Sequence, residues 1–178
     1  AEATLQWLKN YNYNLPLAPW ILIPCLNFDG YQNRTRVNAR GVDLNRNFPA
    51  KNWTSEYKEE RYFPGPHPNS EPETKALSTL ILEFKPRLVV HFHSWKPCIV
   101  CTGHKGRKDA QYLAEASGFE IVEEIGYPTP GSLSSFAWHD HGLPVICTED
   151  EEHRDPNRVW PRFGEGIKKI FFDQSQRQ

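Results

Sequence analysis

The segment from Asn38 to Pro49 gathers the side chains best suited to binding a charged ligand. It reads Asn-Ala-Arg-Gly-Val-Asp-Leu-Asn-Arg-Asn-Phe-Pro, so arginines, asparagines and one aspartate surround a single glycine. This composition does not suit the interior of a helix or a strand and indicates a loop. Guanidinium groups and amides on a loop can bind a carboxylate or an amide. A polar surface loop that binds nothing would have the same composition, so composition alone leaves both interpretations open.

Two histidines end an apolar stretch that begins at Leu88. His91 and His93 are two positions apart and are followed by polar Ser94. Because side chains alternate along a strand, both histidines would face the same side of a sheet. Ligands in α/β proteins bind beyond the carboxyl ends of strands, where His93 would lie. His93 is therefore a candidate metal ligand or base, and a histidine satisfied within the core is the alternative.

Glu149 follows the apolar run from Leu143 to Thr148. A carboxylate at the end of a buried strand is well placed to act as a general base. The alternative is an exposed acid, because Glu149 begins an acidic run that continues to Glu152. Charge alone does not decide between these two interpretations.

Strand-like and helix-like segments alternate along the chain, which favours one α/β domain over residues 1–178. A helix start at Ser70, with Glu73 three residues later, precedes an apolar stripe. Gly118 and Gly142 are expected to close two further helices. The polar segment 27–70 has little expected regular structure, and loops of that length are usually functional. We expect helices at 2–10, 70–84, 109–117, 132–139 and 156–172, and strands at 20–26, 88–93, 98–102, 119–123 and 143–148.

Composition excludes several classes of function. The net charge is -1, so no overall field favours nucleic acid or an anionic membrane, and no apolar run is long enough to span a bilayer. The four cysteines, at positions 25, 98, 101 and 147, lie in or beside apolar stretches. Cys98 and Cys101 have C-x-x-C spacing but no second pair that would complete a zinc knuckle. Buried free thiols are the preferred interpretation, which favours a reducing compartment and a cytoplasmic location.

Several motifs resemble those of the zinc metallocarboxypeptidases, the carboxypeptidase A-like family. The run from Arg36 to Pro49 resembles the substrate-binding segment, and Asn27-Phe28-Asp29-Gly30 resembles the preceding Asn-Pro-Asp-Gly turn, with Phe28 in place of proline. Ser70 to Thr74 resembles a helix start of the family. Gly126 to Ser132 is similar to a segment of its murein peptide amidases, bacterial enzymes that cut the bond between γ-D-glutamate and meso-diaminopimelate.

The resemblance extends from Trp20 to about Asp155 and implies a fold, a metal and a substrate. The implied fold is a mixed, twisted α/β sheet with helices on both faces, truncated at its N-terminus. The implied cofactor is one Zn²⁺ ion. The implied partner is a peptide or murein peptide with a free carboxylate, whereas neither nucleic acid nor a membrane is expected.

The resemblance also implies roles for single residues. Phe92-His93-Ser94 matches the strand that supplies the third zinc ligand, and Gly142-Leu143-Pro144 followed by Glu149 matches the strand that carries the catalytic base. Glu151 is the alternative base, since Cys147 and Asp150 depart from the family pattern. The remaining assignments are Arg36 to polarisation of the scissile carbonyl, Asn45 and Arg46 to the terminal carboxylate, Tyr127 to a mobile cap (or a packing tyrosine), and Leu133 to the vicinity of the specificity pocket.

One expected motif is absent. The family also binds zinc through His-x-x-Glu, and none of the seven histidines here is followed by Glu at the third position. We therefore expect that the sequence begins a few residues past that motif. Because a catalytic zinc site needs three protein ligands, His93 alone predicts an inactive chain within an active intact peptidase. The rival hypothesis is a non-catalytic module that binds peptide carboxylates, although such a module would need neither His93 nor Glu149.

Overall fold

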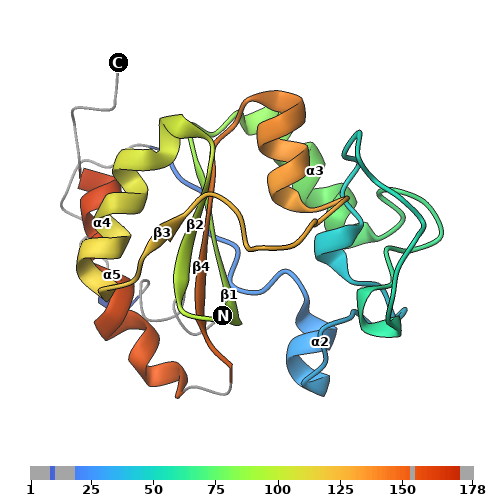
Figure 1. The fold of residues 1–178 in the computed structure, drawn as a ribbon, viewed down its shortest axis with the longest axis horizontal. Coiled ribbons are helices and arrows are strands. Elements are labelled where there is room, and N and C mark those ends of the chain that lie inside the picture. The colour runs from blue at the N-terminus through green and yellow to red at the C-terminus, as the bar shows by residue number, and fades with distance from the viewer. Residues whose placement is uncertain (1–8, 11–18, 153–154, 173–178) are drawn as a thin grey trace. The chain divides into compact units, whose positions relative to one another are not determined.

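The computed structural model describes residues 9–10, 19–152 and 155–172 (Figure 1). It forms two compact units. The first unit comprises residues 1–24, 90–125 and 146–178, and the second comprises residues 25–89 and 126–145. Within the described residues, no helix is both long and apolar enough to cross a membrane.

The first unit contains nearly all of a four-stranded sheet with the order β1-β4-β2-β3. Its strands are β1 (Val89–Trp95), β2 (Cys98–Thr102), β3 (Ile121–Val122) and β4 (Val145–Glu151). Strands β2 and β3 are parallel, with Ile99 opposite Ile121. The sheet is mixed, which confirms the predicted α/β class. The order also makes β1 and β4 hydrogen-bonded neighbours, although they are far apart in the sequence.

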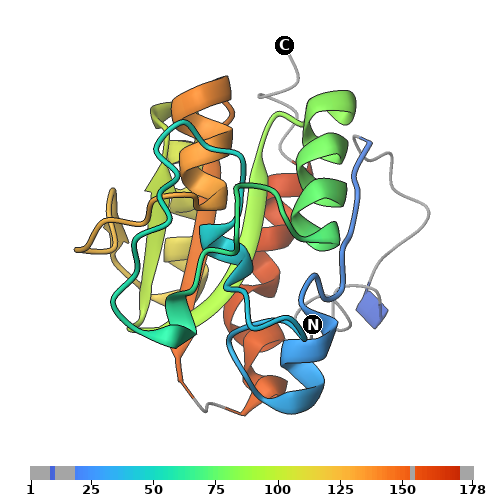
Figure 2. The same ribbon diagram turned by 90° about the vertical axis from the view of Figure 1, so that its right-hand side faces the viewer.

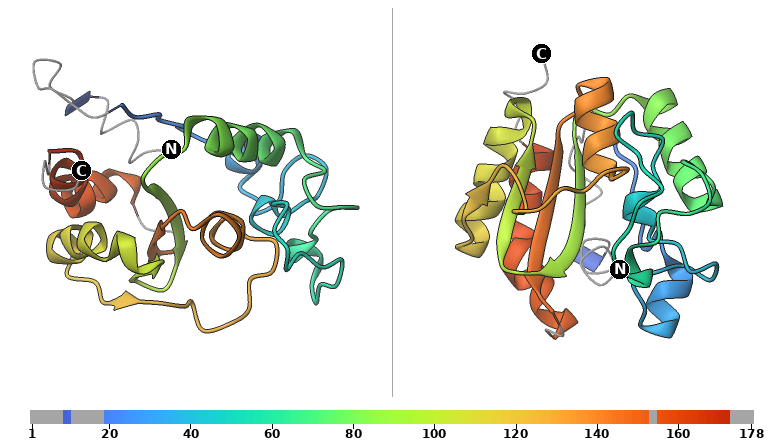
Figure 3. Two further views of the ribbon diagram at one scale, coloured as in Figure 1. Left: turned by 90° about the horizontal axis from the view of Figure 1, so that it is seen from above. Right: turned by 45° about the vertical axis from the view of Figure 1, so that its right-hand side comes forward.

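Two helices of the first unit, α4 (Arg107–Ser117) and α5 (Val159–Phe172), lie side by side (Figure 3). A Cβ at Gly166 would lie 2.6 Å from the Tyr112 carbonyl oxygen, so a glycine is what permits this close approach. Phe163 of α5 is almost fully buried and packs edge-on against Phe92 and Phe119. The short helices η3 (His104–Gly106) and η5 (Pro156–Arg158) precede α4 and α5.

The second unit is built around a long helix, α3 (Pro72–Phe84), and a π-helix, η4 (Ser135–Asp140). The segment between α2 (Phe28–Asn33) and α3 has only two short 3-10 helices, η1 (Leu44–Arg46) and η2 (Glu60–Tyr62) (Figure 2). The core of the second unit contains buried side chains from this segment, from α3, from the region of η4 and from the start of β4. They are Phe48, Ala50, Ile81, Leu133, Phe136, Ala137 and Val145.

Most of the expected elements are present, with shifts at their ends. Strand β2 has the predicted bounds, and α4 ends at Gly118, whose φ of 75° suits glycine. Glu71 rather than Ser70 precedes α3 as its N-cap. Strand β4 continues to Glu151, so Glu149 lies inside the strand instead of following it. The helix expected at 2–10 falls almost wholly outside the described residues.

The strand predicted at 20–26 is wrong. The described residues from 19 onward are irregular until α2 begins. Pro19 and Pro24 lack the N–H groups that a strand ladder requires. Ile21 and Ile23 are exposed, which an apolar core strand would not allow. All four cysteines are free, as predicted, but the expectation that they are buried holds only for Cys101 and Cys147, because Cys25 and Cys98 are half-buried.

Candidate functional site

Asp43 holds together the candidate substrate-binding segment, residues 36–49, which lies in the second unit. Its carboxylate is buried, and Oδ2 accepts a hydrogen bond from Nε of Arg36 at 2.8 Å. The other oxygen, Oδ1, accepts one from the backbone N–H of Asn45 at 3.1 Å and so begins helix η1. One carboxylate thus orients the arginine predicted to polarise a carbonyl and fixes the turn that carries Asn45 and Arg46.

Asn45 and Arg46 are both held in place by backbone contacts. Oδ1 of Asn45 accepts a hydrogen bond from the N–H of Leu133 at 3.0 Å, so the residue expected near a specificity pocket contacts this segment directly. Nη1 of Arg46 donates to the Asn45 carbonyl at 2.7 Å. Arg46 is buried, and this burial lowers the pKa of its guanidinium, although the nearby Asp43 carboxylate opposes the shift. A buried guanidinium of this kind suits an anionic ligand.

Tyr62 is a residue that the sequence analysis missed. The guanidinium carbons of Arg36, Arg46 and Arg61 lie 5.1, 5.8 and 5.2 Å from the centre of its ring. Cations at such distances are attracted to an aromatic face. The only signal in the sequence was an aromatic residue within a highly charged stretch. Tyr127 is 40% exposed and is among the neighbours that raise the pKa of Arg46.

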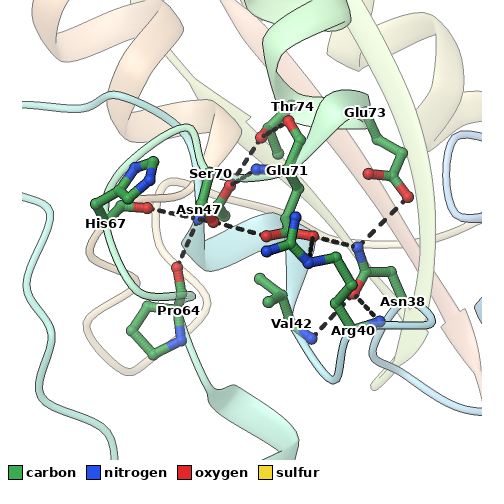
Figure 4. Close-up of polar contacts among 10 residues, drawn as sticks. All are labelled: Asn38, Arg40, Val42, Asn47, Pro64, His67, Ser70, Glu71, Glu73 and Thr74. Carbon is green, nitrogen blue, oxygen red and sulfur yellow. Dashed lines mark hydrogen bonds and ion pairs between the residues drawn. The ribbon is translucent and has the colours of Figure 1, made fainter.

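Asn47 ties the candidate segment to the start of α3 (Figure 4). Its side chain is fully buried, and its Nδ2 lies within 3.0 Å of the carbonyls of Pro64 and His67 and of the Ser70 hydroxyl. Its Oδ1 accepts from the Glu71 N–H and the Thr74 hydroxyl. These contacts hold an otherwise irregular loop in one conformation.

The buried carboxylate of Glu71 anchors the beginning of the same segment. Its Oε2 accepts a hydrogen bond from Nδ2 of Asn38 at 2.8 Å and lies 3.7 Å from Nε of Arg40 (Figure 4). Its Oε1 accepts from the Ser70 hydroxyl at 2.7 Å. The Ser-Glu-Pro-Glu-Thr run thus supports the candidate segment, because it supplies the acid and the hydroxyls to which that segment is hydrogen-bonded.

Gly131 allows a second close approach to the candidate segment. Its φ is +68°, and a Cβ there would collide with the carbonyl oxygen of Arg46. The Gly131 carbonyl accepts from the N–H of Phe48 at 2.9 Å, and its N–H donates to Asn52 at 3.1 Å. A side chain at this position would therefore displace the backbone of Arg46.

The first unit brings together His93 and Glu149. Nδ1 of His93 lies 4.0 Å from Oε1 of Glu149. The two residues come from neighbouring strands, β1 and β4, which explains how positions so distant in the sequence can meet. Glu149 is 3% exposed, whereas Glu151, the alternative base, is exposed at the end of β4. The burial favours Glu149 as the residue held in a defined position.

His91 and Cys147 belong to the same cluster, which the sequence analysis did not foresee. Nδ1 of His91 lies 3.1 Å from Nε2 of His93, and the Cys147 thiol donates to Oε1 of Glu149 at 3.3 Å. Burial lowers the pKa of His91 well below its usual value, and the charge of His93 adds to this effect. Burial, with help from Glu149, raises the pKa of the Cys147 thiol well above its usual value. Both groups are therefore neutral near pH 7.

The donor set of this cluster fits zinc. His91, His93 and Cys147 can each direct one ligand atom so that all three lie within 4.8 Å of one another. Imidazole nitrogen and thiolate sulfur are donors that zinc prefers. Among the described residues of the first unit, the predicted ligand His93 and the predicted base Glu149 are thus accompanied by two further donors.

The family of the chain follows from comparison with known proteins. Residues 14–128 match the family described as zinc carboxypeptidase. Murein peptide amidase A from Escherichia coli (strain K12) is 40% identical over 139 residues, which cover 72% of this chain and 56% of that protein. Carboxypeptidase O from Bos taurus is 34% identical over 197 residues, covering 83% and 52%. The chain spans about half the length of these curated relatives.

Solved structures agree with this assignment. A murein-tripeptide amidase from Escherichia coli O157 is similar with a TM-score of 0.68 and 35% identity, over 82% of this chain and 65% of that one. Carboxypeptidase A from Helicoverpa armigera has a TM-score of 0.71 over 94% of this chain and 55% of that one. Its 20% identity supports the fold alone. Together with the matched residues, these similarities show that the chain belongs to the zinc carboxypeptidase family.

Proposed function

We propose that this chain is part of a zinc-dependent peptidase that hydrolyses the peptide or amide bond next to a free terminal carboxylate. The observation that carries this proposal is the pairing of His93 with Glu149, whose Nδ1 and Oε1 atoms are 4.0 Å apart on neighbouring strands. A metal ligand beside a buried carboxylate is the arrangement that metal-assisted hydrolysis requires.

Glu149 is the general base. Bound zinc would lower the pKa of a coordinated water and polarise the scissile carbonyl. Glu149 accepts the proton of the attacking water and later delivers it to the leaving amine. Its position inside β4 and its burial keep the carboxylate in place.

Residues of the 36–49 segment bind and orient the substrate. Arg46, with Asn45, holds the terminal carboxylate, because a guanidinium fork matches the two carboxylate oxygens. Arg36 donates to the oxygen on which negative charge develops. Asp43 orients Arg36 and begins the turn that carries Asn45, so it is a positioning residue for both tasks.

The substrate class that we favour is a murein peptide, with the bond between γ-D-glutamate and meso-diaminopimelate as the bond that is cut. Two of the relatives reported above are named as amidases of murein peptides, and both share at least 35% of their aligned residues with this chain. The rival function is a module that binds peptide carboxylates without cutting them. It would use Arg46 but would have no use for Glu149.

Hydrolysis by the full-length gene product tests the proposal. Murein tripeptide and a simple peptide with a free C-terminus should both be offered, beside the same peptide with an amidated C-terminus. We expect chelator-sensitive hydrolysis that requires the free carboxylate. Binding of the free acid without hydrolysis, by a zinc-loaded protein, would favour the binding module instead.

A matched pair of variants tests the role of Arg46. Arg46→Lys keeps the charge but loses the fork, and should raise KM for free-acid peptides by about 10- to 100-fold, as expected for hydrogen bonds to a charged group. Lys51→Ala removes an exposed positive charge just after the same segment and should leave KM unchanged. A rise in KM with Lys51→Ala but not with Arg46→Lys would show that net charge, and not carboxylate geometry, governs binding.

A further inference from the structure

Two strands of the first unit bring two further donor side chains close to His93, the candidate metal ligand. His91 and His93 lie on β1, and Cys147 lies on the neighbouring strand β4. One ligand atom from each of the three can lie within 4.8 Å of the others. The family pattern singles out only His93, because His91 has no counterpart in it and Cys147 departs from it.

The spacing of the two imidazoles suits chelation of one metal ion. Nδ1 of His91 and Nε2 of His93 are 3.1 Å apart. Two nitrogens bound to one tetrahedral zinc at ordinary bond lengths lie roughly 3.4 Å apart. The existing distance therefore requires only a small adjustment. Without a metal, these two nitrogens can share a single proton in a hydrogen bond.

The surroundings of the cluster also suit a metal site. The remaining nitrogen of His93, Nδ1, faces Oε1 of Glu149 at 4.0 Å. Ligating histidines commonly direct their second ring nitrogen at a carboxylate, which fixes the ring orientation. Cys147 is buried, and its thiol points at the same carboxylate oxygen. A soft sulfur and two imidazoles favour zinc and cobalt over magnesium or calcium.

We propose that His91, His93 and Cys147 form a metal site with two nitrogen ligands and one sulfur ligand, through which this chain alone binds one zinc ion. The Cys147 S–H bond breaks as the sulfur–zinc bond forms, and the proton is released to the buffer. This site does not depend on peptidase activity. It differs from the expectation drawn from the missing His-x-x-Glu motif, which left His93 as the single ligand in this chain.

Cobalt titration of the metal-free 178-residue chain tests the proposal, because Co²⁺ takes the place of zinc and reports its ligands by absorption. We expect one equivalent of Co²⁺ to produce a thiolate-to-cobalt charge-transfer band in the near ultraviolet, and zinc to abolish the band by displacement. Cys147→Ser should remove the band. His91→Ala should weaken Co²⁺ binding at least tenfold, since loss of even a group that only supports a metal ligand typically costs about 10- to 100-fold in metal affinity.

Cys98→Ser is the matched control. Cys98 is half-buried on β2, beside β4, and is electrostatically coupled to Glu149 and to Cys147. The charge-transfer band should survive its replacement. Far-ultraviolet circular dichroism establishes that each variant is folded, and Cys147→Ala provides a second substitution should Cys147→Ser fail that criterion.

A folded wild-type chain that shows no thiolate band, or whose band survives Cys147→Ser, would overturn the inference. The proposed peptidase function fails by a different result. If the full-length product hydrolyses peptides with zinc bound but shows no thiolate band with cobalt, this result contradicts only the metal-site inference. A thiolate band in a full-length product without any hydrolysis contradicts only the proposed peptidase function.

Discussion

Nε of Arg36 donates a hydrogen bond to Oδ2 of Asp43 over 2.8 Å. The side chain of Asp43 is almost fully buried, whereas the side chain of Arg36 is 29% exposed. The partly exposed guanidinium group of Arg36 is thus held by a buried carboxylate. Since the same carboxylate caps η1 through Asn45, the orientation of Arg36 and the conformation of the turn that carries Asn45 and Arg46 depend on a single side chain.

Asp43→Asn should weaken both contacts of this side chain, the one with Arg36 and the cap of η1. The substitution preserves the size of the side chain but removes the charge that Arg36 contacts. We expect the free energy of unfolding of this chain to fall by about 1–3 kcal/mol, the cost of disrupting a buried charged hydrogen bond. Urea denaturation measures this change. Asp29→Asn, at an acid in the first turn of α2, should change it by no more than about 0.5 kcal/mol.

Glu149→Gln should abolish most of the hydrolysis by the full-length gene product. A glutamine cannot accept the water proton, and loss of a general base typically lowers kcat about 10²- to 10⁴-fold. KM and zinc content should stay close to those of the wild type. Glu151→Gln is the matched control, since Glu151 lies two residues further along β4 and is exposed. A large loss of kcat in the control, with little in Glu149→Gln, would reassign the base to Glu151.

Asn47→Ala should destabilise this chain strongly. The substitution leaves buried backbone and hydroxyl groups around Ser70, Glu71 and Thr74 without their partner. We expect a loss of about 3–5 kcal/mol in the free energy of unfolding, the range seen when a buried polar network is broken. Urea denaturation provides the measurement. Asn157→Ala, at an exposed asparagine, should stay within about 0.5 kcal/mol of the wild type.

Gly131→Ala and Gly41→Ala separate backbone strain from steric collision. Both glycines have positive φ, of 68° and 76°, so both alanines carry a strain of roughly 1–2 kcal/mol. Only the Cβ at position 131 meets other atoms, namely the Arg46 carbonyl and the Trp53 ring, whereas position 41 is open. Gly131→Ala should therefore cost about 1–3 kcal/mol more. Equal unfolding free energies for the two variants would contradict the close approach seen here.

Local patterns were sufficient for the elements whose signals lie within one stretch of chain. Strand β2 and the end of α4 at Gly118 follow from an apolar run and a glycine. The strand expected at 20–26 is absent because Pro19 and Pro24 cannot donate to a strand ladder, which outweighs the apolar residues between them. The course of β4 past Glu149 also escaped prediction, because an acidic run resembles a solvated loop unless its burial is known.

Only the part of the candidate site that lies within one stretch of chain was predicted from the sequence. The residues of the 36–49 segment are close in sequence, so their order carried the information. Contacts between distant segments did not have such a signal. The hydrogen bond from Leu133 to Asn45 and the approach of Cys147 to His91 depend on which segments become neighbours, which single residues do not reveal.

The adjacency of β1 and β4 has an evolutionary consequence. His93 and Glu149 each occupy one place in a hydrogen-bonded ladder. Because a one-residue slip of a strand turns its side chains to the opposite face, the separation between the two groups can change only in whole-residue steps. A slip of register in a descendant would therefore separate His93 from Glu149 altogether, whereas changes in the loops leave their places in the ladder as they are.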